Sequence, residues 1–269
     1  MPGQAYFLMA FANPPEAGLP ALAAEAAGLE KTLSTQHHLS GIVLPKVSFE
    51  QLADTFAQYR NQIYLLHYAG HAGDQELHLL KASGESVEKI HAPSVAHLLA
   101  QYYNLQLVFL NGCATAGQVE ALLDAGIRMV IATQTAIDDQ AARDFSLHFY
   151  SNLLKGQSIE KAFRLASAMR EKSGTAPATV VIRAVRKTAP EPAPMWSLFV
   201  RETARESLDW TLEDLLFPDV FRPEVARLVD HFTGRSAELE QIQSFINSKE
   251  KGRLLVSGPP GIGKSALLA

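Results

Sequence analysis

The chain has 269 residues, 47% of them hydrophobic and 19% charged, and a formal net charge of −4. This balance is typical of a globular protein with material for one large domain and part of another, and it does not favour a nucleic-acid partner. The single cysteine, Cys113, excludes disulfides within the chain. No basic signal-peptide region precedes the first apolar run, and no apolar run reaches the roughly 18–20 residues that cross a bilayer. We therefore expect a cytoplasmic protein without a membrane segment.

Short apolar runs alternate with helical patterns through most of the sequence. In chain order, the predicted strands are 6–11, 41–44, 63–68, 107–110, 128–133, 178–185 and 197–200. The predicted helices are 19–33, 49–60, 94–103, 118–124, 138–154 and 158–171. Because the strands are apolar throughout, without an alternating polar face, they predict a mostly parallel sheet with helices on both faces, an α/β fold.

The alternation of strands and helices stops near residue 200. Residues 201–230 have the composition of a linker, and a helix over 237–247 and a strand over 253–256 are predicted after it. We therefore expect a first domain over 1–200, a linker over 201–230 and the start of a second domain over 231–269.

Two predicted strands end next to reactive side chains. The strand 63–68 leads to His71, and the strand 107–110 leads to Cys113, each directly after a glycine. Functional groups gather at the carboxyl ends of strands in open parallel sheets. An imidazole beside a thiol favours the thiolate and can protonate a leaving group, so the two residues could form a nucleophilic pair. The alternative is that Cys113 is a small core residue and His71 a hydrogen-bonded structural one.

A family resemblance favours the catalytic interpretation. The segments His-Tyr-Ala-Gly-His at 67–71 and Val-Phe-Leu-Asn-Gly-Cys at 108–113 resemble the CHAT family, caspase-like peptidase domains common in bacteria. The resemblance covers most of residues 1–200 and continues through 126–133, Asp138-Asp139, 149–158 and 162–166. It implies a caspase-hemoglobinase fold, cleavage of peptide bonds and a catalytic dyad of His71 and Cys113.

The resemblance also implies that backbone amides bind the oxyanion. They are those of Ala72 or Gly73, after the histidine, and of Cys113. The family usually has glycine directly after the catalytic histidine, whereas this chain has Ala72, followed by Gly73. An amide does not depend on its side chain, so Ala72 is compatible with the role if the turn keeps its geometry.

Asp138 and Asp139 follow a predicted strand and open a predicted helix. Carboxylates suit a helix N-terminus, which is one interpretation of both residues. In the other, one of them lines the substrate pocket and selects a basic side chain by charge pairing.

The histidines do not predict a metal centre. His67 and His71 have the spacing of ligands on a helix, but their segment is predicted as a strand, so the two side chains need not share a face. His78, His91 and His97 add no convincing set. We expect no metal and no cofactor for the peptidase.

Residues 258–265, Gly-Pro-Pro-Gly-Ile-Gly-Lys-Ser, match the phosphate-loop pattern. Gly258, Gly261 and Gly263 would let backbone amides surround a phosphate, while Lys264 would neutralise it and Ser265 would offer its hydroxyl to Mg²⁺. Upstream, residues 232–239 resemble the start of signal-transduction ATPases with numerous domains.

The sequence stops at Ala269, before a second acidic Mg²⁺ ligand. We expect ATP and Mg²⁺ to bind only to a longer protein, no ATPase activity from this chain, and poor order from about residue 230.

Together these features predict a cysteine endopeptidase, with activity that can be latent, acting on a protein substrate as the effector of an ATP-dependent signalling or defence protein. Other domains or subunits of an assembly would be its partners. One alternative is a non-catalytic caspase-like adaptor domain. Another is a nucleotide-binding regulator to which the first domain is merely attached.

Overall fold

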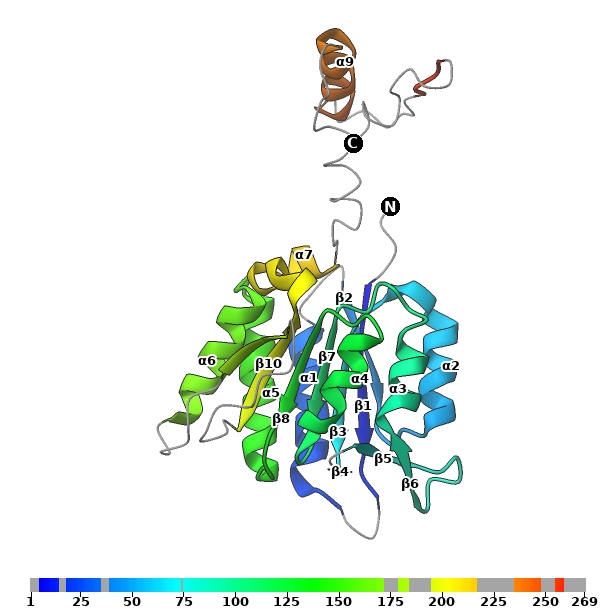
Figure 1. The fold of residues 1–269 in the computed structure, drawn as a ribbon, viewed down its shortest axis with the longest axis vertical. Helices are drawn as coiled ribbons and strands as arrows, with labels where there is room; N and C mark the ends of the chain where they lie inside the picture. Colours follow the sequence, from blue (N-terminus) through cyan, green and yellow to red (C-terminus); the bar gives the residue numbers. More distant parts are fainter. Residues whose placement is uncertain are drawn as a thin grey trace. The chain divides into compact units, whose positions relative to one another are not determined.

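The computed structural model describes residues 5–14, 18–34, 39–73, 75–171, 179–183, 195–216, 235–247 and 255–258. The chain forms two compact units, Met1–Phe217 and Pro218–Ala269. In the first unit, seven strands form one sheet in the order β2-β1-β3-β7-β8-β10-β9 (Figure 1).

Each of the seven predicted strands is present in this sheet. They are β1 (Ala5–Ala12), β2 (Leu39–Leu44), β3 (Ile63–Gly70), β7 (Leu107–Asn111), β8 (Met129–Thr133), β9 (Thr179–Arg183) and β10 (Trp196–Arg201). The five strands from β2 to β8 are parallel neighbours, whereas β10 runs antiparallel to β8 and parallel to β9. The expectation of a mostly parallel sheet is confirmed.

Helices cover both faces of the sheet, as predicted. The helices of this unit are α1 (Pro20–Leu33), α2 (Phe49–Tyr59), α3 (Ala92–Leu99), α4 (Val119–Asp124), α5 (Asp139–Leu154), α6 (Ile159–Glu171) and α7 (Leu212–Leu216). Short 3-10 helices are η2 (Arg60–Gln62), η3 (Thr115–Gln118) and η4 (Glu202–Asp209). The helices α1, α5 and α6 pack on one face of the sheet, and α2, α3 and α4 pack on the other (Figure 1).

The strand β1 shows why the sequence lacks a polar alternation. Phe7, Met9 and Phe11 enter the core beneath α1 and α5, while Leu8 and Ala10 enter the core beneath α2 and α3. Successive side chains of a strand point to opposite faces, and here both faces are buried. The sheet is therefore a rigid central layer from whose edge loops project.

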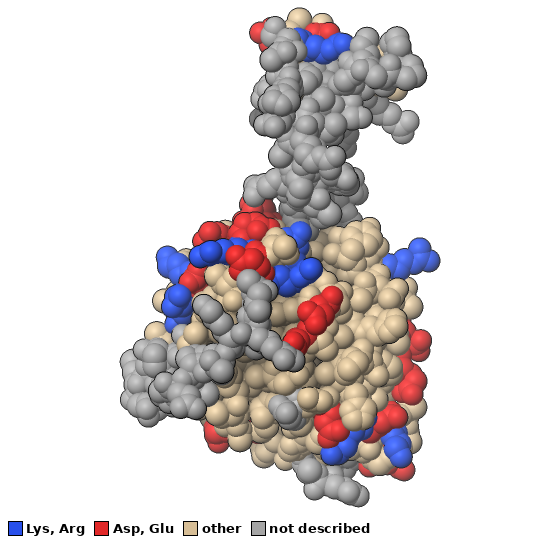
Figure 2. Space-filling model, in the orientation of Figure 1, with Lys and Arg blue, Asp and Glu red and all other residues tan. Residues whose placement is uncertain are grey.

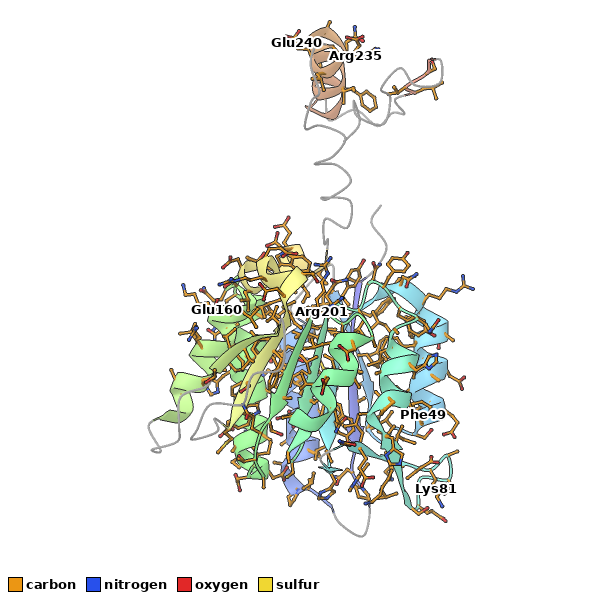
Figure 3. The ribbon with its side chains drawn as sticks, in the orientation of Figure 1. Phe49, Lys81, Glu160, Arg201, Arg235 and Glu240 are labelled. Carbon is orange, nitrogen blue, oxygen red and sulfur yellow. The ribbon has the colours of Figure 1, made fainter. Side chains whose placement is uncertain are left out.

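A second, three-stranded sheet follows β3 and was not predicted. Its strands are β4 (Ala72–Gly73), β5 (Glu76–Leu80) and β6 (Val87–His91), all antiparallel to their neighbours. The sheet lies at the carboxyl ends of β1 and β3 (Figure 1). In Figure 3, Lys81 lies beside this small sheet, and Arg201 lies towards the other end of the seven-stranded sheet.

The first unit extends beyond residue 200, because residues predicted as linker pack onto it. The side chains of Leu208, Leu215 and Leu216 are buried in the core beneath η4 and α7. The N–H of Ile159 donates to Trp210 O at 2.8 Å, which ties this segment to the start of α6. The boundary of the compact unit falls after Phe217, so the expected linker over 201–230 begins too early.

The second unit contains α9 (Ser236–Asn247), which confirms the helix predicted over 237–247. The described residues 255–258 have no regular secondary structure, so this part of the expected strand over 253–256 is not found. Gly258 is the only described residue of the phosphate-loop motif. Gly261, Gly263, Lys264 and Ser265 lie outside the described residues.

The surface of the first unit carries charges of both signs. On the face drawn in Figure 2, basic and acidic side chains are interspersed, mostly towards the margins, and much of the middle is uncharged. In the part of the chain that the structure describes, no helix has the length and apolar character needed to span a membrane.

Candidate active site

The strands β3 and β7 bring His71 and Cys113 to the same edge of the sheet. Their parallel register pairs Leu65 with Leu107 and continues without a shift to Ala69 and Asn111. His71 and Cys113 each follow two residues after this last pair, in the turns that leave the two neighbouring strands. Both residues are half-buried, so neither is sealed in the core.

Two glycines allow the strand ends to approach each other closely. A Cβ atom on Gly112 would lie 2.6 Å from Gly70 O and 3.2 Å from Ala72 Cβ. A Cβ atom on Gly70 would lie 2.7 Å from Ala12 O and 2.9 Å from the hydroxyl of Tyr68. A larger residue at Gly112 would push the segments that carry His71 and Cys113 apart, and a larger residue at Gly70 would push the end of β3 away from β1.

The backbone of His71 is held from both sides. Its carbonyl oxygen accepts a hydrogen bond from the Tyr68 hydroxyl at 2.5 Å and another from the His78 N–H at 3.1 Å. The Tyr68 hydroxyl also lies 3.0 Å from His78 O. Because Tyr68 is buried, its ring anchors the turn after β3 to the body of the domain.

Cys113 lies in a tight turn between β7 and η3. Its Sγ lies 3.9 Å from Ile137 O, in the loop before α5. The next residue, Ala114, has φ 50° and ψ 43°, a left-handed conformation that costs a non-glycine residue about 1 kcal/mol. The N–H of Ala114 donates to Thr135 O at 3.2 Å, which helps to hold the turn in place.

The antiparallel pairing of β4 with β5 sets the direction of the amides after His71. The hydrogen bond from His78 N–H to His71 O makes these two residues a hydrogen-bonded pair. Because such pairs alternate along an antiparallel ladder, the next pair, Ala72 and Leu77, is a non-hydrogen-bonded pair. The N–H of Ala72 therefore points away from β5. Gly73 belongs to the following pair, so its N–H faces β5. Of the two candidate amides, only that of Ala72 is left unused by the pairing of β4 with β5.

Gln118 links the segments that follow His71 and Cys113. Its buried side-chain amide donates to Glu76 O at 3.2 Å and lies 3.4 Å from Gly73 O. Gln118 belongs to η3, directly after the Cys113 turn, whereas Gly73 and Glu76 flank the β4–β5 connection. Sequence analysis missed Gln118, because its importance depends on the unpredicted small sheet.

His67, the other histidine of the 67–71 segment, is fully buried in the core beneath α1 and α5. Its ring packs against Phe109, with the ring centroids 4.8 Å apart. It therefore has no access to a substrate, unlike the half-buried His71.

Both aspartates at the start of α5 accept backbone hydrogen bonds. The carboxylate of Asp138 accepts from Ala141 N–H at 2.9 Å and caps α5. The carboxylate of Asp139 accepts from Ala21 N–H at 2.7 Å, in the first turn of α1. One carboxylate oxygen of each residue thus accepts a hydrogen bond from a backbone N–H at the start of a helix. The substrate-selecting role of these residues stays a prediction.

Among the residues that the structure describes, no three histidine, cysteine, aspartate or glutamate side chains form a group that could hold a metal ion. A pocket of about 290 Å³ is lined by Tyr102, Arg128 and Arg201, at the end of the sheet opposite His71 and Cys113. It has no part in the candidate site.

The first unit is thus an α/β domain with a seven-stranded, mostly parallel sheet, in which His71 and Cys113 follow two neighbouring strands. The family model described as CHAT domain matches residues 4–210. The chain therefore belongs to the CHAT domain family. This match also includes residues 201–210, in agreement with the packing of η4 onto the domain.

Solved structures similar to this chain include two cysteine proteases. A secreted C11 cysteine protease from Bacteroides thetaiotaomicron, in complex with an irreversible peptide inhibitor, has 12% identity and a TM-score of 0.47, over 63% of this chain and 60% of that one. The Porphyromonas gingivalis RgpB pro- and mature domains have 15% identity and a TM-score of 0.44, over 76% and 48%. Chaetomium thermophilum Raptor has 8% identity and a TM-score of 0.42, over 56% and 18%. The chain thus spans less than two thirds of each of these proteins. No curated protein sequence matches it.

Proposed function

We propose that the first unit is a cysteine endopeptidase whose catalytic dyad is His71 and Cys113. The observation that supports this proposal is the parallel pairing of β3 with β7, since His71 and Cys113 follow the ends of these two neighbouring strands. Membership of the CHAT domain family supports it. Neither residue is sealed in the core, which supports access of a peptide to them.

In the first half of the reaction, His71 accepts the thiol proton of Cys113, and the thiolate attacks the peptide carbonyl carbon. A C–S bond forms while the carbonyl electron pair moves onto oxygen. The N–H groups of Cys113 and of Ala72, or alternatively Gly73, bind this oxyanion. When the oxyanion collapses, the C–N bond breaks and His71 passes its proton to the leaving amine.

In the second half, water attacks the thioester and His71 accepts the proton of that water. The C–S bond then breaks, the sulfur of Cys113 regains its proton from His71, and the carboxylic acid product leaves and loses its own proton to water. The cycle needs no metal and no cofactor. Its substrate is a protein or peptide, and one of Asp138 and Asp139 would select a basic side chain next to the cleaved bond.

The direct test compares the wild-type chain with Cys113→Ala in a cell lysate, by sequencing newly formed peptide termini. Termini that appear only with the wild-type chain are the expected result. The variant keeps the fold, because alanine is smaller than cysteine and Cys113 is only half-buried. Equal numbers of new termini with both proteins would contradict the proposal and favour a non-catalytic adaptor domain.

The phosphate-loop motif supports a second part of the proposal, that the peptidase is the effector of an ATP-dependent switch in a longer signalling or defence protein. The support is the sequence pattern from Gly258 to Ser265. Calorimetric titration with ATP and Mg²⁺ tests it: we expect weak or absent binding to this chain and binding to a longer chain, lost on Lys264→Ala. A longer chain that does not bind ATP would contradict it.

A further inference from the structure

The helix α1 carries a buried carboxylate that the proposed reaction does not use. The side chain of Glu25 is 2% exposed, whereas Glu30 on the same helix is exposed. Gly28 lets α1 approach α5 closely, since a Cβ atom there would lie 2.8 Å from Leu147 Cδ2. A carboxylate is costly to bury unless it is well hydrogen-bonded, so the partners of Glu25 are informative.

Three polar side chains converge on one oxygen of Glu25. Its Oε1 accepts hydrogen bonds from Asn111 Nδ2 at 2.8 Å and from Ser146 Oγ at 2.5 Å. The Nε2 of His67 lies 3.2 Å from the same oxygen. This distance is short enough for an ion pair, but the two groups are not aligned as a hydrogen bond. All four side chains are buried, so bulk water cannot replace any of these partners.

Tyr150 completes the cluster on the far side of His67. Its hydroxyl lies 3.2 Å from His67 Nδ1. Burial is the main cause, and the charge of Glu25 the second, that raises the pKa of Tyr150 well above its usual value. The hydroxyl therefore stays protonated and can donate a hydrogen bond to Nδ1.

The cluster joins the elements from which the candidate dyad projects. Asn111 is the last residue of β7, two positions before Cys113, and His67 lies in β3, four positions before His71. Asn111 Nδ2 also donates to Ala142 O in α5 at 3.1 Å, and Ser146 belongs to the same helix. Glu25 therefore fixes β3, β7 and α5 to one another directly beneath the candidate site.

We propose that Glu25 is a positioning residue, which holds the ends of β3 and β7 at the separation and height that let His71 activate Cys113. This inference rests on the proposed dyad and deepens it. Glu25 touches neither reacting group, and acts through Asn111 and His67. A displacement of about 1 Å caused by a change away from the chemistry can slow a reaction about 100-fold, so such support is large enough to measure.

Cys113 is the only cysteine, so the rate of its alkylation by iodoacetamide reports on the site without any knowledge of the substrate. The rate is measured on the intact chain, well below the temperature of unfolding, for Glu25→Leu, Glu25→Gln and Ser146→Ala. The matched control is Glu30→Leu, which changes an exposed residue of the same helix. His71→Ala reports on the dyad itself, and the unfolding midpoint of each variant is measured in parallel.

We expect Glu25→Leu to alkylate at least about tenfold more slowly than the wild-type chain, because its apolar side chain cannot accept from Asn111. Glu25→Gln keeps an amide oxygen that can accept the same hydrogen bonds, so its rate should stay within about threefold of the wild-type rate. Ser146→Ala removes only one of the hydrogen-bond donors to Glu25, so it still tests the inference if Glu25→Leu does not fold. It should be slowed about threefold in a folded protein. Glu30→Leu should match the wild-type chain.

If Glu25 has a purely structural role, the Glu25 and Ser146 variants will have lower unfolding midpoints, but the folded proteins will alkylate at the wild-type rate. That result, together with slower alkylation of His71→Ala, would overturn this inference and leave the proposed dyad standing. If His71→Ala alkylates as fast as the wild-type chain, the proposed dyad fails and there is nothing for Glu25 to position. The two failures are therefore distinguishable.

Discussion

Thr115 and Thr133 exchange hydrogen bonds across the turn that carries Cys113. The N–H of Thr115 donates to Thr133 Oγ1 at 3.1 Å, and the N–H of Thr133 donates to Thr115 Oγ1 at 3.0 Å. Each hydroxyl also donates to a carbonyl of β7 or its turn, Thr115 to Leu110 O at 3.1 Å and Thr133 to Gly112 O. Because both residues are fully buried, the exchange fastens the Cys113 turn to the end of β8.

The first prediction concerns this exchange. Thr133→Val keeps the shape of the side chain and removes the hydroxyl, so the Gly112 carbonyl and the Thr115 N–H lose their partner. The free energy of unfolding, measured in urea, should fall by about 1–3 kcal/mol, the usual cost of leaving buried polar groups unpaired. Thr203→Val, at an exposed position in η4, is the control and should change it by less than about 0.5 kcal/mol. Equal effects of the two changes would contradict the buried exchange.

The second prediction concerns Tyr68. Burial raises the pKa of its hydroxyl well above the usual value, so the group remains a donor to His71 O at any pH that the fold tolerates. Tyr68→Phe removes this hydrogen bond and should lower the free energy of unfolding by about 1 kcal/mol. It should also slow Cys113 alkylation, because the backbone of His71 is held less firmly. Tyr103→Phe, at a residue 69% exposed, should leave both quantities unchanged. An unaltered alkylation rate in Tyr68→Phe would show that His71 does not need this anchor.

The third prediction concerns pH and Glu76, at the start of β5. Lys89 Nζ lies 2.5 Å from its Oε1, and His78 Nε2 lies 3.3 Å from the same atom. The hydrogen bond from Lys89, followed by that from His78, lowers the pKa of Glu76. A carboxylate with a lower pKa in the folded state stabilises the protein above its ordinary range near pH 4, and this contribution disappears as the pH falls through the folded-state value.

Glu76→Gln should therefore lower the thermal midpoint at pH 7 and leave it nearly unchanged near pH 3. The comparison of wild-type and variant midpoints at the two pH values measures the effect. Glu85→Gln, at an exposed residue of the β5–β6 connection, serves as the control and should show no such pH dependence. If the difference between the wild-type and Glu76→Gln midpoints grew as the pH fell, it would contradict a stabilising role for the ionised Glu76.

The fourth prediction separates capping from substrate selection at Asp138. Asparagine caps a helix about as well as aspartate, so Asp138→Asn should keep the hydrogen bond to Ala141 and the fold, but lose the charge. If the charge selects basic side chains, the preference for arginine-containing over neutral fluorogenic peptides should fall about tenfold or more. Asp139→Asn tests the neighbouring carboxylate in the same way. A wild-type preference for aspartate-containing peptides would exclude a selective role for both residues.

The sheet could be predicted from the sequence because its strands are unbroken apolar runs, and such runs are what a sheet buried on both faces requires. The positions of His71 and Cys113 at strand ends followed from Gly70 and Gly112, which close the runs. The neighbour relation of β3 and β7 could not be predicted from the runs alone, since strand order depends on how the whole sheet assembles. The family resemblance supplied that information indirectly.

The positions of Glu25, Gln118 and residues 202–216 could not be predicted in the same way. Glu25 shares the buried face of α1 with Leu22, Leu29 and Leu33. Its partners, however, come from β3, β7 and α5, which are far from it in the sequence. Gln118 acts on a small sheet whose strands are short and of mixed polarity. The charged residues of η4 favoured a linker, although the leucines at 208, 215 and 216 were a visible signal of packing.

The packing of η4 and α7 decides where this domain can be separated from the rest of the protein. A fragment that ends at residue 200 would strip Leu215 and Leu216 from the hydrophobic core and leave the underside of α6 and β10 in contact with water. Such a fragment would tend to precipitate and would give misleading assays. A fragment cut after Phe217 keeps the apolar contacts that η4 and α7 make with the domain, and is the better starting material for crystals and for enzymology.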